Sequence, residues 1–289
     1  MKSEQTNKIT KPKTITIIGG NGKMGNLFAQ ALKKEKNINI LISDHKTKLT
    51  NIEATKQSDI IIITVPITKT CEVIEKIGPH IKDGAMITDF TSVKINPINS
   101  MKKSTKQNKN IEILGGHPLF GPTAGFKNQN IILCQETKGK YYNWYKQFLK
   151  KQELKVIEMT AKEHDKNMAI IQGLTHLSNI SLGHTITKLN CNLKSIEEIS
   201  TPIYLMGIFN VGRILAQDEQ LYSDIQMENP YTIEVSNNYY QAVKELNQTI
   251  EKRDKQNFKK IFNNSKTFFN NILTKSMEIT DKLIKGMKQ

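Results

Sequence analysis

The first 160 residues alternate short, continuously apolar runs with helical segments, and this rhythm constrains the fold more than any other feature. The runs are TITIIGG (14–20), NINILIS (37–43), DIIIITVP (59–66), AMITDFTS (85–92), IEILGG (111–116), NIILCQ (130–135) and LKVIEM (154–159). Strands that are apolar at every position, rather than at every second one, are buried on both faces. Their alternation with helices predicts a Rossmann-type α/β fold, a doubly wound parallel sheet with right-handed crossovers.

After about residue 160 this rhythm stops, and helical patterns continue to the end of the chain. We therefore expect an α/β domain over 14–160 and an all-α C-terminal domain over 161–289. Residues 1–13 are polar and lysine-rich and are interpreted as a solvated tail. The lysine-rich segment MKKSTKQNKN (101–110) is expected to be a solvated loop.

The formal net charge of +15 raises the possibility of nucleic-acid binding. The basic residues, however, are 40 lysines and only two arginines, Arg213 and Arg253, and the lysines are spread along the whole chain. Proteins that read phosphates and bases rely on arginine forks. We therefore expect no nucleic-acid partner.

The chain lacks the long apolar run of a membrane-spanning helix, and its N-terminus has no apolar segment typical of a secretory signal. Cys71, Cys134 and Cys191 lie far apart without a CxxC motif, which is typical of a reducing compartment. These features predict a cytoplasmic protein without a membrane partner.

The segment GGNGKMG (19–25) follows the first expected strand and opens the first expected helix. In this context Gly20 permits a tight turn, Gly22 lets the backbone approach a pyrophosphate, and Gly25 lets helix and strand pack closely. The helix N-terminus supplies free N–H groups. The expected cofactor-binding residues here are Gly20, Gly22, Lys23, Met24 and Gly25. A glycine-rich turn that binds nothing is the alternative.

Asp44 ends the second expected strand, where an acidic residue can hold both ribose hydroxyls of NAD. The neighbouring His45, Lys46 and Lys48 could tolerate a 2′-phosphate, so NAD is favoured and NADP is less favoured.

Three further motifs follow expected strands: Val65-Pro66, TSVK (91–94) and GGHPLFGPTAG (115–125). The glycine and proline content of the last motif predicts a rigid loop rather than a helix or the interior of a strand. Because ligands bind outside the carboxyl ends of parallel strands, His117 is placed where a substrate would meet a nicotinamide. A histidine bonded only within its own loop is the alternative.

The segment EHDKNMAIIQGLTH (163–176) carries His164 and His176 on one expected helix. Twelve positions separate them by about 18 Å along a helix, so they cannot share an ion, and no metal site is expected. Arg213 lies in an otherwise apolar helix, where a buried guanidinium requires an anion. A carboxylate substrate is the expected partner, and a salt bridge to Asp218 is the alternative.

Together these motifs resemble the prephenate dehydrogenase family of tyrosine biosynthesis, especially the form fused to a chorismate mutase. The resemblance extends from about residue 14 to 275. The motifs that show it are GGNGKMG, VPI, TSVK, GGHPLFGP, EHDKNMAIIQGLTH, and PIY followed by VGRILAQDEQLYSDI. The resemblance implies NAD-dependent oxidative decarboxylation of prephenate to 4-hydroxyphenylpyruvate. It also implies a homodimer formed through the helical domain.

The resemblance also assigns roles to residues. His117 corresponds to the histidine that takes the hydroxyl proton, and Ser92 to the serine that bridges this histidine, the hydroxyl and the nicotinamide. Arg213 corresponds to the arginine that grips a substrate carboxylate. The remaining substrate-binding candidates are His176, Gln217, Tyr222 and Thr123.

The chain departs from the family pattern at Leu205, where the family has an arginine after PIY. No mutase domain precedes the glycine motif, so we expect a separate mutase chain or one removed from this sequence. Arogenate dehydrogenase, the same reaction on the transaminated substrate, is the close alternative. A non-catalytic dinucleotide-binding regulator is the alternative from another class, and feedback by tyrosine is left open.

Overall fold

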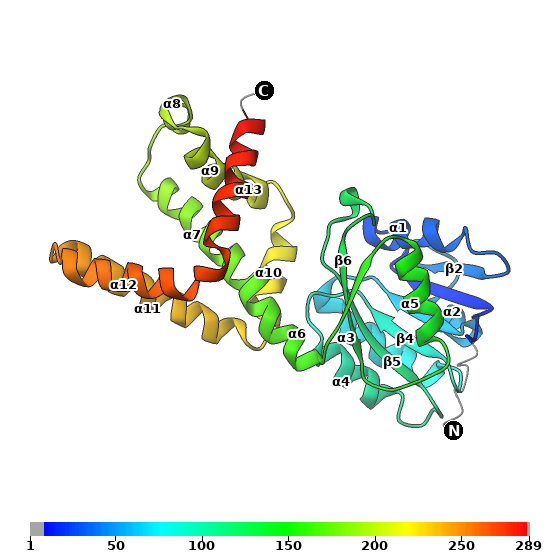
Figure 1. Ribbon diagram of the computed structural model, residues 1–289. Helices are drawn as coiled ribbons and strands as arrows, with labels where there is room; N and C mark the ends of the chain where they lie inside the picture. Colours follow the sequence, from blue (N-terminus) through cyan, green and yellow to red (C-terminus); the bar gives the residue numbers. More distant parts are fainter. Residues whose placement is uncertain (1–8, 288–289) are drawn as a thin grey trace, which may run out of the picture. The chain divides into compact units, whose positions relative to one another are not determined.

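The computed structural model describes residues 9–287, and Figure 1 shows the two compact units into which the chain divides. The first comprises residues up to 168 together with 227–230, and the second comprises 169–226 together with the residues from 231 onward. Most of the expected polar tail, residues 1–8, lies outside the described residues.

The first unit is built on a seven-stranded sheet with the order β2-β1-β3-β4-β5-β6-β7. The strands are β1 (Thr14–Ile18), β2 (Asn39–Ser43), β3 (Ile60–Ile63), β4 (Met86–Asp89), β5 (Glu112–Pro118), β6 (Asn130–Gln135) and β7 (Lys155–Glu158). Each coincides with an expected strand, and the strand order reverses between β1 and β3. This confirms the Rossmann-type class and creates a crevice at the carboxyl ends of those two strands.

The sheet is mostly parallel, as expected, and departs from the parallel direction at β6, which pairs antiparallel with β5. The connection between these strands holds only a short 3₁₀ turn, Pro122–Ala124. A parallel pair needs a crossover connection, usually a helix, whereas neighbouring strands joined without one run antiparallel. All other neighbouring strands are parallel.

Helices cover both faces of the sheet (Figure 1). They are α1 (Lys23–Leu32), α2 (Asn51–Gln57), α3 (Ile67–Ile77), α4 (Ile95–Ser104), α5 (Tyr142–Lys151) and α6 (Ala161–Met168). Ile60 and Ile62 of β3 pack on the face that α1 and α5 cover, whereas Ile61 and Ile63 pack on the face of α3 and α4. This explains the continuous apolar run, since each buried isoleucine contributes about 1.5–3 kcal/mol to folding.

The expectation of a solvated loop over 101–110 is wrong at its beginning, because α4 continues to Ser104. Ile98 and Met101 lie three residues apart on the buried side of this helix, and Met101 is fully buried. The run of lysines that follows hid this short apolar stripe.

The motif around His117 also departs from its expected conformation. Gly115, Gly116 and His117 belong to β5, in which every residue is buried. A Cβ on Gly115 would come within 2.8 Å of the Lys94 side chain, and one on Gly116 within 2.8 Å of the Asp89 carbonyl oxygen. The two glycines therefore make room for neighbouring groups inside the sheet rather than forming a turn.

The second unit is helical, as expected for the C-terminal half. It contains a π-helical segment (Ala169–Leu174), α7 (Thr175–Lys188), α8 (Leu193–Ile199), α9 (Pro202–Leu215), α11 (Thr232–Glu251), α12 (Lys255–Phe268) and α13 (Leu273–Gly286), with most of α10 (Glu219–Glu228). Helix α7 packs on α9, and α11 packs on the π-helical segment. In the described part of the chain, no helix has the length and apolar character needed to cross a membrane.

Candidate active site

The glycine motif forms the turn between β1 and α1. The residue in the left-handed region is Gly19, with φ of +79°, so the tight turn is made one position before Gly20, where the motif predicted it. Gly22 is the N-cap of α1, and no side chain caps this helix. Its first N–H groups therefore point outward without a side-chain acceptor, which is the arrangement that binds phosphate.

Gly20 and Gly25 hold the turn against the sheet. A Cβ on Gly25 would lie 2.6 Å from both the Gly19 carbonyl oxygen and the Thr64 hydroxyl. A Cβ on Gly20 would lie 2.8 Å from the Ile42 side chain. These contacts leave no space for a larger residue, so the expected close packing of helix and strand at Gly25 is present.

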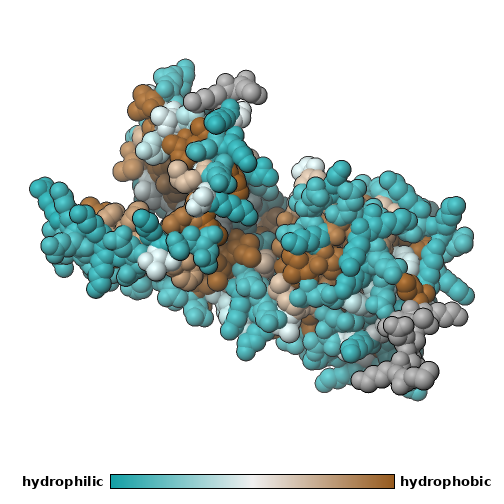
Figure 2. Space-filling model, viewed as in Figure 1, coloured by the Kyte–Doolittle hydropathy of each residue, from teal (hydrophilic) through white to brown (hydrophobic). Residues whose placement is uncertain are grey.

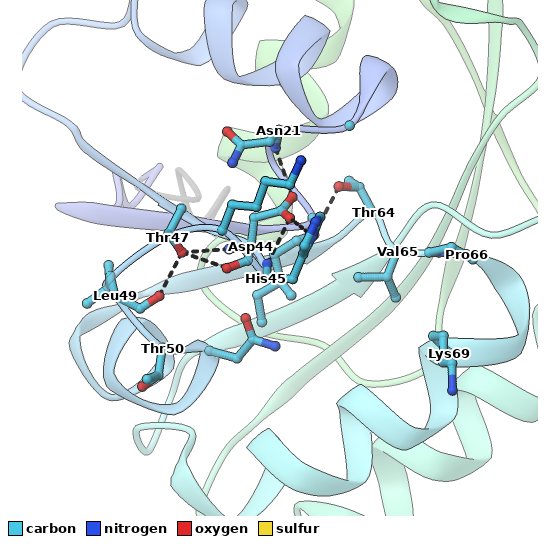
Figure 3. A pocket seen from close by; sticks show the side chains of 15 residues that line it. Asn21, Asp44, His45, Thr47, Leu49, Thr50, Thr64, Val65, Pro66 and Lys69 are labelled. Atoms are coloured by element: carbon cyan, nitrogen blue, oxygen red, sulfur yellow. Dashed lines mark hydrogen bonds and ion pairs between the residues drawn. The ribbon is translucent and has the colours of Figure 1, made fainter.

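A pocket of about 760 Å³ opens beside this turn (Figure 3). Its walls come from the ends of β1, β2 and β3, and they include the cofactor-binding candidates Gly22, Asp44, Val65 and Pro66. The candidates Gly20, Lys23, Met24 and Gly25 do not line it. Lys46 and Lys69 add positive charge to the wall.

Asp44 is largely buried at the end of β2, with its side chain only 8% exposed. Its carboxylate accepts hydrogen bonds from the backbone N–H groups of Asn21 at 3.2 Å and His45 at 2.8 Å, and one of its oxygens lies 2.5 Å from His45 Nδ1. Figure 3 shows this carboxylate between the glycine turn and the loop after β2. An uncapped helix N-terminus, a glycine cradle and a fixed carboxylate together fit a dinucleotide.

His117 lies at the carboxyl end of β5 and is 2% exposed. Its Nδ1 is 2.8 Å from Nε2 of His164 on α6, and the two rings meet edge to face. Within residues 9–287, Nε2 of His117 has no hydrogen-bond partner, yet it is not one of the fully enclosed polar atoms. Burial, with the nearby His164 and the positive Lys94, holds the pKa of His117 well below its ordinary value of 6.5.

His164 is fully buried, and its Nδ1 is 2.7 Å from the carboxylate of Asp165. Burial lowers the pKa of His164, and the hydrogen bond to Asp165 partly opposes this shift. The same carboxylate accepts the backbone N–H groups of Lys94 at 2.7 Å and Ile95 at 2.9 Å. Asp165 thus binds the start of α4 as well as His164.

Lys94 is a further buried charged residue next to His117. Its ammonium is fully buried, forms an ion pair with Asp89 and donates to the Gly116 carbonyl oxygen at 2.7 Å. A buried charge of this kind requires a partner, because an unpaired one would cost several kcal/mol. The ion pair therefore fastens β4 to the backbone just before His117.

The other candidates of this unit lie in loops. Ser92 is partly buried in the loop between β4 and α4, after the strand next to β5. Thr123 lies exposed on the 3₁₀ turn between β5 and β6. No hydrogen bond joins either side chain to His117 in the described residues.

The substrate-binding candidates of the helical unit form one group. The rings of His176 on α7 and Tyr222 on α10 meet edge to face, with centroids 4.7 Å apart. Burial raises the pKa of Tyr222, and the positive charge of nearby Arg213 on α9 partly offsets this rise. The Gln217 amide donates to the Arg213 carbonyl oxygen at 2.9 Å. Burial also lowers the pKa of His176, whose Nδ1 is enclosed and has no hydrogen-bond partner in the part of the chain that the structure describes.

Arg213 is exposed, and within residues 9–287 its guanidinium forms no salt bridge, so the alternative partner Asp218 does not hold it. Asp218 instead accepts the backbone N–H of Gln220. Leu205, the departure from the family pattern, is partly buried on α9.

Sequence reasoning missed the roles of three buried charged residues, Asp89, Lys94 and Asp165. A signal was present, since Asp89 and Lys94 flank the FTSV stretch at the end of an apolar strand, and buried charges occur in pairs. Asp165 stands next to His164 in sequence, but its second partner, the start of α4, is far away along the chain.

The fold and this pocket define a dinucleotide-binding protein of the Rossmann type. Comparison with known proteins narrows the class. A family model described as "Prephenate dehydrogenase, nucleotide-binding domain" matches residues 27–158, and one described as "Prephenate dehydrogenase, dimerization domain" matches 160–264. The chain belongs to the prephenate dehydrogenase family, which confirms the resemblance seen in the motifs.

Individual relatives agree with this assignment. A "probable arogenate/prephenate dehydrogenase" of Methanocaldococcus jannaschii is 34% identical, over 94% of this chain and 64% of its own length. A "T-protein" of Enterobacter agglomerans is 32% identical, over 88% of this chain and 67% of its own length. The chain thus spans about two thirds of the length of these relatives.

Solved structures share the fold. A prephenate dehydrogenase from A. aeolicus, solved with hydroxyphenyl propionate and NAD+, aligns over 94% of this chain and all of its own, with a TM-score of 0.67 and 18% identity. A Synechocystis arogenate dehydrogenase aligns over 90% of this chain and all of its own, with a TM-score of 0.65 and 18% identity.

The packing at Gly25 predicts that Gly25→Ala weakens dinucleotide binding. The new methyl group would collide with backbone and hydroxyl atoms at 2.6 Å, so the turn must shift away from the phosphate position. We expect at least a tenfold weaker NAD affinity in a fluorescence or calorimetric titration. Gly286→Ala, at a glycine with open space around it, is the matched control and should bind normally. Unchanged affinity in Gly25→Ala would contradict the assignment of the cradle.

Proposed function

We propose that the protein is an NAD-dependent prephenate dehydrogenase, which converts prephenate to 4-hydroxyphenylpyruvate and CO₂ in tyrosine biosynthesis. Membership of the family across both halves of the chain supports the reaction. The observation that carries the chemistry is His117, a buried imidazole at a strand end of the dinucleotide-binding sheet, whose Nε2 has no hydrogen-bond partner among residues 9–287.

His117 is suited to act as the base of this reaction. Its Nε2 takes the proton of the substrate hydroxyl, and the depressed pKa keeps the imidazole neutral, and so able to accept, at neutral pH. NAD, when bound, accepts the hydride from the hydroxyl-bearing ring carbon. The ring carboxylate then leaves as CO₂, and its electron pair enters the ring, which becomes aromatic.

The remaining residues are assigned to binding and orientation. Ser92, in the loop after β4, is proposed to bridge His117, the hydroxyl and the nicotinamide. Arg213 is proposed to bind a substrate carboxylate, and its exposed guanidinium without a salt-bridge partner in the described chain supports this role. Three further substrate-binding candidates belong to the same group of side chains as Arg213 in the helical unit: His176, Gln217 and Tyr222. Thr123 is a further substrate-binding candidate in the first unit.

NAD is the favoured cofactor over NADP. The fixed carboxylate of Asp44 lines the pocket where it can accept both ribose hydroxyls and would repel a 2′-phosphate. Lys46 opposes this preference through its positive charge. A related protein of Schizosaccharomyces pombe is named as a probable NADP(+) enzyme, so both cofactors belong in the assay.

A homodimer formed through the helical unit and a cytoplasmic location complete the proposal. Many large apolar side chains of this unit are exposed, among them Ile199, Tyr204, Ile233 and Phe268. Figure 2 shows apolar surface gathered over these helices. Extensive exposed apolar surface marks an interface, and light scattering would measure the oligomeric state. All three cysteines are free, in keeping with a reducing compartment.

Offering prephenate and arogenate, each with NAD and with NADP, and following nicotinamide reduction tests the proposal. Turnover of prephenate with NAD is expected to be the fastest of the four. Faster turnover of arogenate would favour the alternative, which the M. jannaschii relative's double name keeps relevant. Cofactor binding without turnover of either substrate would indicate the non-catalytic regulator.

The pKa of His117 predicts the pH dependence of the reaction. The base works only when neutral, that is, above its pKa, and burial places that pKa below 6.5. We therefore expect kcat/KM for prephenate to stay constant as pH falls to 6.5 and to decline only at lower pH. An acid limb centred above 6.5 would contradict a buried base.

Replacing the base predicts a large loss of rate. His117→Asn should retain NAD affinity and lower kcat by roughly 10²–10⁴-fold, the usual contribution of a general base. Steady-state kinetics and NAD titration measure the two quantities. His184→Asn, at an exposed histidine on α7, is the control. Near-normal turnover of His117→Asn would remove the assignment.

Removing the guanidinium predicts a loss of binding. Arg213→Gln should raise KM for prephenate, because it weakens substrate binding by about 2–4 kcal/mol. This is the typical cost of truncating one partner of a charged pair that the substrate buries. Arg253→Gln, which removes the only other arginine, is the matched control and should leave KM unchanged. An unchanged KM in Arg213→Gln would exclude the carboxylate contact.

A further inference from the structure

The hydrogen-bond chain behind His117 fixes which of its nitrogens carries a proton. One oxygen of the Asp165 carboxylate already accepts the Lys94 N–H and has only lone pairs to offer His164 at 2.7 Å. A carboxylate accepts and does not donate, so Nδ1 of His164 holds the proton.

The second link follows from the first. His164 is fully buried, and its lowered pKa favours the neutral ring. A neutral ring protonated at Nδ1 has a bare Nε2, which can only accept. Nδ1 of His117, 2.8 Å away, must therefore donate. In a neutral His117 this leaves Nε2 bare, and Nε2 is the nitrogen of this ring that has no hydrogen-bond partner in the described residues.

We propose that Asp165 and His164 are positioning residues that hold His117 in the Nδ1-protonated tautomer, with Nε2 ready to accept the substrate proton. The inference rests on the proposed function for the role of His117 as the base. It adds how the chain keeps that base in its reactive form. A free neutral imidazole can carry its proton on either nitrogen, whereas this arrangement excludes the unreactive form.

The relay keeps its hydrogen bonds after the proton transfer. When Nε2 of His117 takes the hydroxyl proton, the ring becomes an imidazolium whose Nδ1–H still donates to His164. The negative charge at the far end of this relay is the Asp165 carboxylate, which accepts a hydrogen bond from His164. The other charges that act on it are the buried pair Lys94 and Asp89, which oppose each other.

Asp165 is held where this role requires it. Both of its oxygens accept backbone N–H groups at the start of α4, and its own carbonyl oxygen accepts the Asn229 amide at 2.8 Å. All of these groups belong to the first compact unit. The relay is therefore complete within one unit.

Nitrogen-15 NMR of the full-length protein, labelled in its histidine rings, reads the tautomer directly. The chain has six histidines, and the signal absent from His117→Asn identifies His117. We expect the wild-type ring to be protonated at Nδ1 with a bare Nε2. His164→Leu removes the acceptor, and we expect His117 to shift toward the Nε2-protonated form.

The conservative variant His164→Gln provides the rescue. The carboxylate of Asp165 can only accept, so the Gln amide N–H₂ must face it and the Gln carbonyl must face His117. The Nδ1-protonated tautomer should therefore persist. We expect kcat to fall by roughly 100-fold or more in His164→Leu and by a much smaller factor in His164→Gln, with NAD affinity unchanged in both.

Asp165→Asn tests the negative charge separately. It should lower kcat by at least tenfold at unchanged NAD affinity, whereas Glu163→Gln, which removes a charge from an exposed residue of the same helix, should not. Thermal melting establishes that each variant is folded. If His164→Leu does not fold, the His117 tautomer measured by NMR in the wild-type protein and in His164→Gln still tests the inference.

An Nε2-protonated His117 in the wild-type protein would overturn the inference. So would a folded His164→Leu whose kcat lies within threefold of wild type. If wild type turns over neither prephenate nor arogenate, the proposed function fails while the NMR result still tests the tautomer. The two failures are thus distinguishable.

Discussion

One carboxylate joins the parts of this molecule that its chemistry depends on. Asp165 binds the first backbone N–H groups of α4 and, through His164, the ring of His117. The loop that carries Ser92 ends at α4, so the same residue fixes the positions of two proposed catalytic side chains. Such a buried acceptor is stable only because every one of its contacts is a donor.

The buried Lys94 explains the glycines in front of His117. Its side chain crosses the sheet beside Gly115 and reaches the carbonyl of Gly116, where a larger residue would collide with it. Its charge is balanced by Asp89 at the end of the neighbouring strand. The order of the strands, the positions of the glycines and the ion pair are therefore linked, because all three allow the Lys94 side chain to pack at the carboxyl edge of the sheet.

The sequence allowed all seven strands to be predicted, because strands buried on both faces show long apolar runs. It did not reveal the antiparallel β6, since direction depends on the connection rather than on the strand itself. The glycine turn and His117 were found because local motifs carry them. Asp89, Lys94 and Asp165 were missed because their partners lie in other elements, and the π-helical segment at 169–174 has no signal in apolar periodicity. Residue roles drawn from family resemblance stay predictions.

The uncapped start of α1 has a thermodynamic consequence. A helix that opens at a glycine, with no side chain to accept its first N–H groups, is less stable than one with a serine or aspartate there. An anionic ligand at this position completes the helix by accepting those groups. The ligand therefore supplies hydrogen-bond acceptors that the ligand-free protein lacks at Gly22. As the dinucleotide saturates its site, the free energy of unfolding of the protein rises.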